Sequence, residues 1–180
     1  MTVRSRPDIG FRPLAESDFP RMTGWLAQPH VRVFFQKTPI SLEEVAAKYG
    51  PRLRGEDPTL AHLALFEGRP FGYLQCYRNV DYPEWAAEIS TEAGLSIDLY
   101  IGEPDLIGAG YGRAMLGAYV RDVAFPLHPD ETRCYIAHAH ANTAALACSR
   151  AVGFRDLGDF VEDDVAMRLL LIERDQIASR

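Results

Sequence analysis

The sequence contains no apolar run close to the roughly 18–20 residues that a membrane-spanning helix needs. Residues 1–7 likewise lack the apolar stretch of a secretory signal peptide. Only three cysteines occur, Cys76, Cys134 and Cys148, and their spacing fits neither a disulfide framework nor a zinc site. These absences predict a cytoplasmic protein with free thiols, without a metal ion and without a membrane partner.

Positive charge is also scarce, since the 19 Lys and Arg residues are outnumbered by 25 Asp and Glu residues and the formal net charge is −6. This sign argues against a nucleic-acid partner, because such proteins contact phosphates through basic side chains. No Lys or Arg occurs between Arg78 and Arg113, and a second acidic run lies between Arg155 and Arg168. Such runs are usually solvated loops. The alternative is a negative field that attracts a cationic substrate.

The length suits a single domain spanning residues 1–180. A capping box, in which Ser41 is followed by Glu44, marks one helix start. Residue periodicity and turn residues predict strands at 9–14, 60–66, 71–77, 95–101, 133–139 and 165–172, helices at 18–27, 41–54, 113–125 and 142–152, and a polar insertion at 79–93. One strand–helix–strand crossover follows from this order, so the fold class is a mixed α/β sheet.

The strongest local motif is a glycine-rich turn between a predicted strand and a predicted helix, Ile107-Gly108-Ala109-Gly110-Tyr111-Gly112-Arg113. Glycines at alternate positions let the backbone approach a ligand, and a helix start offers unpaired N–H groups and the positive end of the helix dipole. The motif therefore predicts a pyrophosphate cradle, to which Arg113 adds a formal charge. It is not a P-loop, because no Gly-Lys-Ser/Thr follows, and no second nucleotide-binding half follows to favour a dinucleotide fold.

Together with the preceding segment 96–104, this turn resembles the acetyl-CoA-binding core of the GNAT superfamily of N-acetyltransferases. The resemblance is strongest to the aminoglycoside 6′-N-acetyltransferase branch and extends from about Phe11 to Leu170. It implies the GNAT fold, a mixed, mostly antiparallel sheet with a central parallel splay and flanking helices. It also implies direct transfer of acetyl from the cosubstrate acetyl-CoA to a primary amine within a ternary complex.

The resemblance further implies roles for individual residues. Acetyl-CoA would be held by Leu99, Tyr100, Ile101, Ile107, Gly108, Ala109, Gly110, Tyr111, Gly112, Arg113 and Asn142. The substrate would meet Trp25, His30, Tyr82, Trp85 and Asp98. Asp98 falls where the aminoglycoside enzymes carry an aspartate that faces the substrate amine. A carboxylate there can bind the ammonium form, orient it and accept a proton, so Asp98 is the predicted catalytic base.

Two positions depart from the family pattern. Ile107 stands where the family usually has Gln or Arg, although backbone groups can still bind phosphate there. The tyrosine that serves the family as proton donor to the CoA thiolate aligns with Ser149, whose side chain is shorter. Three possibilities follow: Ser149 acts through water, Tyr111 or Tyr119 takes its place, or the thiolate leaves without a donor. Ser149 is the predicted second catalytic residue.

The preferred hypothesis is 6′-N-acetylation of an aminoglycoside-type polyamine, which confers antibiotic resistance by removing a cation. One alternative is an acetyltransferase of siderophore biosynthesis that acts on a hydroxylysine-like amine. Relatives of that kind tend to carry His in place of Asp98, and a carboxylate favours a polycation whereas His serves as a neutral base. A second alternative, motivated by Ser149, is a non-catalytic acetyl-CoA-binding module. The sequence leaves both a monomer and a homodimer open.

Overall fold

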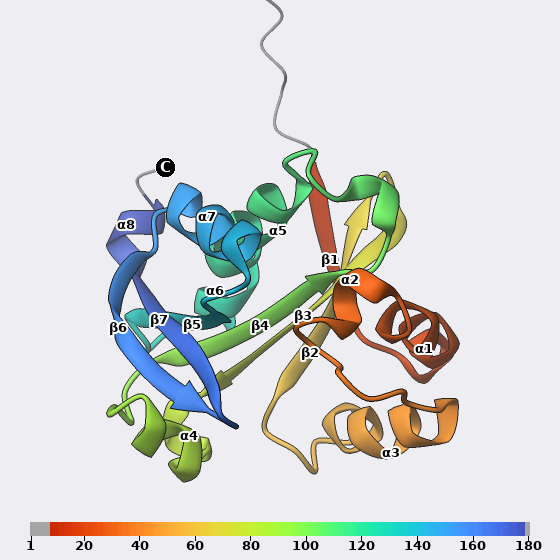
Figure 1. Cartoon of the computed structure of the whole chain (residues 1–180), viewed down its shortest axis with the longest axis horizontal. Helices are drawn as coiled ribbons and strands as arrows, with labels where there is room; N and C mark the ends of the chain where they lie inside the picture. The colour runs from red at the N-terminus through yellow and green to blue at the C-terminus, as the bar shows by residue number, and fades with distance from the viewer. Residues whose placement is uncertain (1–7, 179–180) are drawn as a thin grey trace, which may run out of the picture.

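The computed structural model describes residues 8–178, and within that range seven strands form one sheet in the order β1-β2-β3-β4-β5-β7-β6 (Figure 1). The strands are β1 (Ile9–Pro13), β2 (Leu60–Phe66), β3 (Arg69–Arg78), β4 (Leu95–Ile101), β5 (Arg133–Ala139), β6 (Arg155–Glu162) and β7 (Val165–Glu173). Neighbouring strands are antiparallel except β4 and β5, which are parallel. The predicted mixed, mostly antiparallel sheet is confirmed.

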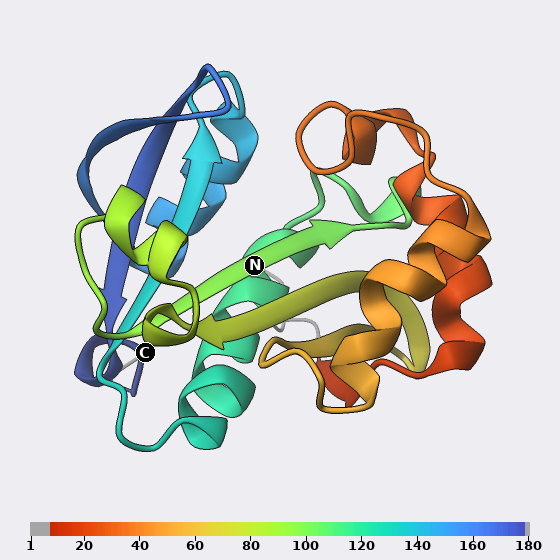
Figure 2. The ribbon, with the colours of Figure 1, turned by 90° about the horizontal axis from the view of Figure 1, so that it is seen from below.

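Helices cover both faces of this sheet (Figures 1 and 2). The α-helices are α1 (Phe19–Leu26), α2 (Pro29–Arg32), α3 (Leu42–Leu53), α4 (Pro83–Glu88), α5 (Tyr111–Tyr119), α6 (Phe125–Leu127), α7 (Thr143–Val152) and α8 (Arg174–Ala178). One apolar core lies between the sheet and α5 and α7, and includes Met115 and Leu146. A second lies between the opposite face and α1 to α3, and includes Met22 and Val45. α4 packs over β5 and β7.

The parallel pair separates soon after it begins. Register between β4 and β5 is limited to Leu95 with Cys134 and Ser96 with Tyr135. From Ile97 onward β4 continues beside β3 alone, so its backbone on the β5 side has no strand partner. Figure 2 shows the two halves of the sheet diverging from this point. This divergence is the central splay that the resemblance to the GNAT superfamily implies.

Alternation along β4 decides which side chains face the opening. Ile97 belongs to the core beneath α5, whereas Tyr100 belongs to the core beneath α1 to α3. Successive strand residues point to opposite faces, so Asp98 shares the face of Tyr100. On that same face the register sets Gln75 of β3 opposite Asp98 and Tyr73 opposite Tyr100. The register thereby places the polar pair Gln75 and Asp98 beside the aromatic pair Tyr73 and Tyr100 on one face of the sheet.

Two acidic stretches are more ordered than a solvated loop. The second acidic run forms the edge strand β6, where Asp156 and Asp159 pair with Arg150, Arg168 and His140. Its sequence, Arg-Asp-Leu-Gly-Asp-Phe-Val-Glu, mixes charged and apolar residues on both faces, which is why periodicity does not reveal it. The polar insertion at 79–93 includes α4, with Pro83 at its first turn. No helix among residues 8–178 has both the length and the apolar character that crossing a membrane requires.

Candidate active site

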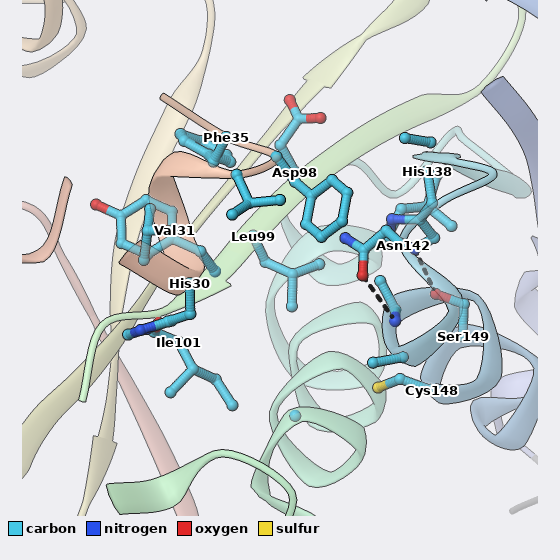
Figure 3. A pocket seen from close by; sticks show the side chains of 18 of the residues that line it. His30, Val31, Phe35, Asp98, Leu99, Ile101, His138, Asn142, Cys148 and Ser149 are labelled. Atoms are coloured by element: carbon cyan, nitrogen blue, oxygen red, sulfur yellow. Dashed lines mark hydrogen bonds between the residues drawn. The ribbon is translucent and has the colours of Figure 1, made fainter. Parts of the chain in front are cut away.

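A cavity of about 1140 Å³ opens where β4 leaves β5. Its walls are α2 with the segment that follows it, the exposed side of β4, the glycine-rich turn, the end of β5, α7 and the tip of the β6–β7 hairpin. Figure 3 shows His30 and Phe35 on one wall and Asn142, Cys148 and Ser149 on another. The splay of the two parallel strands therefore creates the site, because it leaves space between elements that a continuous sheet would fill.

The glycine-rich turn lies at the base of α5. Gly108 and Gly110 adopt φ angles of 76° and 89°, a left-handed conformation that glycine tolerates best, and α5 begins directly afterwards at Tyr111. A Cβ atom added to either glycine would meet no atom within 4 Å, so the space above both is open. Arg113 also lines the cavity. An open helix start beside a guanidinium fits a pyrophosphate group.

His30 fixes the end of β4. Its Nε2 lies 2.9 Å from the carbonyl oxygen of Ile101. A carbonyl only accepts hydrogen bonds, so Nε2 carries the proton and donates. The contact joins α2 to β4 at the cavity wall, and both residues line the cavity. His30 therefore orients the strand whose unpaired backbone groups face the opening.

Asp98 lies on β4 at the cavity wall, where Figure 3 shows it near Phe35. Its Oδ2 accepts a hydrogen bond of 2.8 Å from Nε2 of Gln75. Burial raises the pKa of Asp98, against the opposing effects of the Gln75 hydrogen bond and the positive charges of Arg52 and Lys48. A carboxyl group with a raised pKa inside a cavity is suited to exchanging a proton with a ligand.

Ser149 lies on α7, with 1% of its surface exposed. Its Oγ is 2.8 Å from Nε2 of His138, and Figure 3 marks this contact between two side chains that line the cavity. Burial lowers the pKa of His138 to about 4, so the imidazole is neutral at pH 7. The neighbouring Cys148 also lines the cavity, and burial raises the pKa of its thiol.

A model of the acetyltransferase (GNAT) domain matches residues 15–161 of the chain, well over half of its length. The chain belongs to the GNAT acetyltransferase family. The match confirms the predicted enzyme class and, with it, acetyl-CoA as the cosubstrate of this acetyltransferase.

Relatives of this acetyltransferase include the aminoglycoside N(6′)-acetyltransferase type 1 of Klebsiella pneumoniae, 23% identical over 167 residues, or 91% of this chain and 82% of the relative. The aminoglycoside acetyltransferase AAC(6′)-Ib, solved in complex with coenzyme A and kanamycin, has a TM-score of 0.85 at 21% identity and covers 96% of this chain and 98% of its own. The aminoglycoside N(6′)-acetyltransferase of Legionella pneumophila has a TM-score of 0.74 at 18% identity, covering 99% of each chain. These likenesses confirm the GNAT fold.

Most residues predicted to bind acetyl-CoA line the cavity of this acetyltransferase: Leu99, Tyr100, Ile101, Ile107, Gly108, Gly110, Gly112, Arg113 and Asn142. Two do not. The side chain of Tyr111 packs against Phe66 and Phe71, with ring centroids 4.8 and 6.0 Å away. Ala109 also lies outside the lining residues. A turn can bring its backbone to a ligand without directing every side chain there.

Three aromatic residues predicted to meet substrate, Trp25, Tyr82 and Trp85, lie outside the cavity lining. Trp25 is 4% exposed and donates from Nε1 to Glu103 over 3.0 Å. Trp85 donates to Ser96 over 2.8 Å, and the hydroxyl of Tyr82 donates to Asp57 over 2.8 Å. Each ring packs among the fold's own elements, and its polar atom already has a protein partner.

The structure also distinguishes the three residues that could donate a proton to the CoA thiolate, Ser149, Tyr111 and Tyr119. Tyr119 is fully buried, with its hydroxyl 3.0 Å from Nδ1 of His62, and neither it nor Tyr111 lines the cavity. Ser149 does line it. No sequence pattern indicated that His138 would be the partner of Ser149, since the two come from different elements. His140, two residues further, instead contacts Asp159 at 2.8 Å.

The lowered pKa values of two buried histidines predict how the stability of the fold changes with pH. Burial lowers the pKa of both His62 and His138 to about 4, against about 6.5 for a histidine in an unfolded chain. As the pH falls below about 6.5 the unfolded chain binds protons first, so the free energy of unfolding should decrease down to about pH 4. Urea unfolding of the wild type and of His62→Gln/His138→Gln across this range tests the prediction. An equally steep decrease in the double variant would contradict it.

Proposed function

We propose that this acetyltransferase transfers acetyl from acetyl-CoA to a primary amine of an aminoglycoside-type polycation, at the 6′ position. The observation that carries the proposal is the placement of a carboxylate, Asp98, in the same cavity as the glycine cradle. The named relatives support the substrate class, because they are aminoglycoside N(6′)-acetyltransferases and one was solved with kanamycin. Modification of the amine would remove a positive charge and give resistance to the antibiotic.

In this proposed reaction the chain's own residues act in sequence. Asp98 binds the substrate ammonium, orients it and accepts its proton, which frees the nitrogen lone pair to form the new C–N bond at the acetyl carbon. The nitrogen loses its second proton to solvent, the C–S bond breaks to leave the neutral amide, and the electron pair of that bond leaves with sulfur. Ser149 lies on another wall of the same cavity and donates a hydrogen bond toward the leaving thiolate, directly or through water, before solvent protonates it. His138 holds the Ser149 hydroxyl in place.

Carboxylates at the tip of the β6–β7 hairpin favour a cationic substrate. Glu162 and Asp163 line the cavity together with Asp98. Burial raises the pKa of Glu162, and the charges of Glu88, Asp98 and Asp163 raise it further, against Lys37. Like charges gathered around one cavity repel one another, and a ligand with several ammonium groups relieves that repulsion.

The double variant Glu162→Gln/Asp163→Asn is therefore expected to raise KM for a polycationic amine roughly 3- to 10-fold, with little change in kcat, since each partly exposed ion pair contributes about 0.2–1 kcal/mol. The wild-type KM should also rise with salt, and the KM of the variant should rise less. Initial rates at two ionic strengths provide the measurement. Asp164→Asn is the matched control, because Asp164 lies in the same turn but outside the cavity lining. Equal KM values for variant and wild type would exclude the hairpin from substrate binding.

An amine screen tests the proposed function. The purified protein is supplied with acetyl-CoA and with kanamycin-type aminoglycosides, linear polyamines or hydroxylysine, and release of free thiol is followed. Turnover is expected with the aminoglycosides, and NMR of the product should place the acetyl group on the 6′ nitrogen. Preference for hydroxylysine would favour the siderophore alternative. Tight binding of CoA without turnover on any amine would show a non-catalytic module and overturn the proposal.

A further inference from the structure

A polar network lies behind Asp98, on the face of the sheet that α3 covers. Arg52 of α3 extends over β3, with 12% of its side chain exposed. Its Nη1 donates to the hydroxyl of Tyr73 over 2.9 Å and also to Oε1 of Gln75. The Tyr73 hydroxyl donates to the same Oε1 over 2.7 Å. The Gln75 carbonyl oxygen therefore accepts two hydrogen bonds from one side.

These two donors fix the orientation of the Gln75 amide. A guanidinium has only donors, so the amide NH₂ group cannot face it, and the oxygen must. The NH₂ group is then directed to the other side, where Nε2 donates to Oδ2 of Asp98 over 2.8 Å. An N–H donor held in this direction favours the carboxylate form of Asp98, whose oxygens only accept hydrogen bonds. Arg52 thus determines what Gln75 offers to Asp98.

Arg52 is itself held in place on its far side. Its Nε lies 3.7 Å from Oδ2 of Asp57, and its guanidinium lies 4.9 Å from the ring centroid of Tyr49. Oδ1 of Asp57 accepts from the Thr59 amide and the Tyr82 hydroxyl, both over 2.8 Å. Neither Arg52 nor Gln75 lines the cavity. Any effect of Arg52 on the site must therefore pass through Gln75 or through its charge.

Several charged or titratable groups surround Asp98 in addition to this network. α3 contributes Lys48 and Tyr49 besides Arg52, β3 contributes Tyr73 and Tyr77, and β6 contributes Glu162. Burial raises the pKa of Asp98, whereas Gln75, Arg52, Tyr77 and Lys48 all lower it. Arg52 is the one of these groups that both supplies a positive charge and orients the Gln75 donor.

We propose that Arg52 is a positioning residue that acts through Gln75 to keep Asp98 in its carboxylate form and to fix the direction of its oxygens. The inference rests on the proposed function only where it treats Asp98 as the base of the acetyl transfer. The effect of Arg52 and Gln75 on the ionisation of Asp98 does not depend on the proposed function. The two parts can therefore be measured separately.

The test compares Arg52→Met, Arg52→Lys and Gln75→Leu with the wild type. The Asp98 carboxyl is titrated by ¹³C NMR, with its signal assigned from its loss in Asp98→Asn, and kcat/KM is measured against pH. Arg52→Met is expected to raise the Asp98 pKa by about 1 unit or more, since a nearby opposite charge lowers a carboxyl pKa by roughly 1–3 units. The acid limb of the kcat/KM profile should move to higher pH by the same amount. At a fixed pH on that limb, kcat/KM should then be roughly tenfold lower than in the wild type.

Two further variants separate charge from orientation. Arg52→Lys keeps the charge without the fork of donors, so it should recover part of the shift. Gln75→Leu keeps Arg52 but removes the donor, so it should raise the Asp98 pKa while the Arg52 charge remains. The matched control is Arg54→Met, because Arg54 lies two residues away, bonds to Glu56 and has 52% of its side chain exposed. It should leave both readouts unchanged.

Unchanged titration of Asp98 in Arg52→Met and in Gln75→Leu would overturn the proposal, whatever the activity. If Arg52→Met does not fold, as judged by circular dichroism, Arg52→Lys and Gln75→Leu decide by the same criterion. A shifted titration in a protein that acetylates no amine would overturn the proposed function while leaving the role of Arg52 toward Asp98 supported. A shifted titration with a shifted acid limb supports both.

Discussion

Asp98→Asn is expected to lower kcat for amine acetylation by about 100-fold or more, as loss of a general base does. The substitution keeps the size of the side chain, and Gln75 can still donate its 2.8 Å hydrogen bond to the amide oxygen. What disappears is the negative charge that binds the ammonium and the basic oxygen that accepts its proton. Steady-state thiol release with saturating acetyl-CoA provides the measurement.

The pH dependence strengthens this test. Because burial raises the pKa of Asp98 above the ordinary value of 3.8, the base form becomes available only above that raised pKa. The kcat/KM of the wild type should therefore rise with pH along an acid limb displaced upward from the range of a free aspartate, and Asp98→Asn should lack this limb. Glu92→Gln is the control, since Glu92 belongs to the same acidic stretch but does not line the cavity. A rate and an amine affinity that both stay at wild-type values would show that Asp98 is structural.

Gly102→Ala is expected to destabilise the fold by roughly 3 kcal/mol, at the upper end of what overpacking usually costs. A Cβ atom at Gly102 would lie 2.1 Å from Cδ2 of Trp25, and Trp25 is 4% exposed with its Nε1 bound to Glu103. The ring cannot move away without disturbing Tyr100, whose ring centroid is 6.3 Å away, at the end of β4. For a chain of this size the midpoint of thermal unfolding should fall by about 6–12 °C.

Thermal unfolding followed by circular dichroism checks this expectation, and Gly24→Ala is the matched control. Gly24 lies in α1, and an added Cβ atom there would meet nothing within 4 Å. Alanine favours a helix over glycine by up to about 1 kcal/mol, so this control should be neutral or stabilising. Because β4 forms a cavity wall, Gly102→Ala should also lower activity. Equal unfolding midpoints for the two variants would show that the Trp25 contact does not constrain the fold.

The parts of the site that the sequence predicts are those encoded within a short stretch of chain. Gly108 and Gly110 mark a turn, the periodicity after them marks a helix, and Asp98 stands out in an apolar strand, all within residues 96–125. Backbone conformation and strand alternation are local properties, so the cradle and the face of Asp98 can be inferred without a tertiary structure. The family match and the splay of β4 from β5 agree with these inferences.

Side chains that meet from distant elements could not be predicted in the same way. Trp25 and Trp85 look as suitable for a substrate wall as Phe35 does, yet packing directs the two tryptophans into the fold and Phe35 into the cavity. Large aromatic residues on an amphipathic helix or insertion can fill a core or line a cavity, and only the neighbours available to each ring decide between them.

By itself, then, the sequence determined the sheet class, the glycine cradle and the carboxylate on β4, because each follows from local backbone preferences and the period of side chains along one strand or helix. Only the tertiary structure decided that His138 meets Ser149 and that Arg52 reaches Asp98 through Gln75. His138 and Ser149 are 11 residues apart in the sequence, and Arg52 and Asp98 are 46 residues apart. Their geometry depends on how the helices pack on the sheet, which no local pattern specifies.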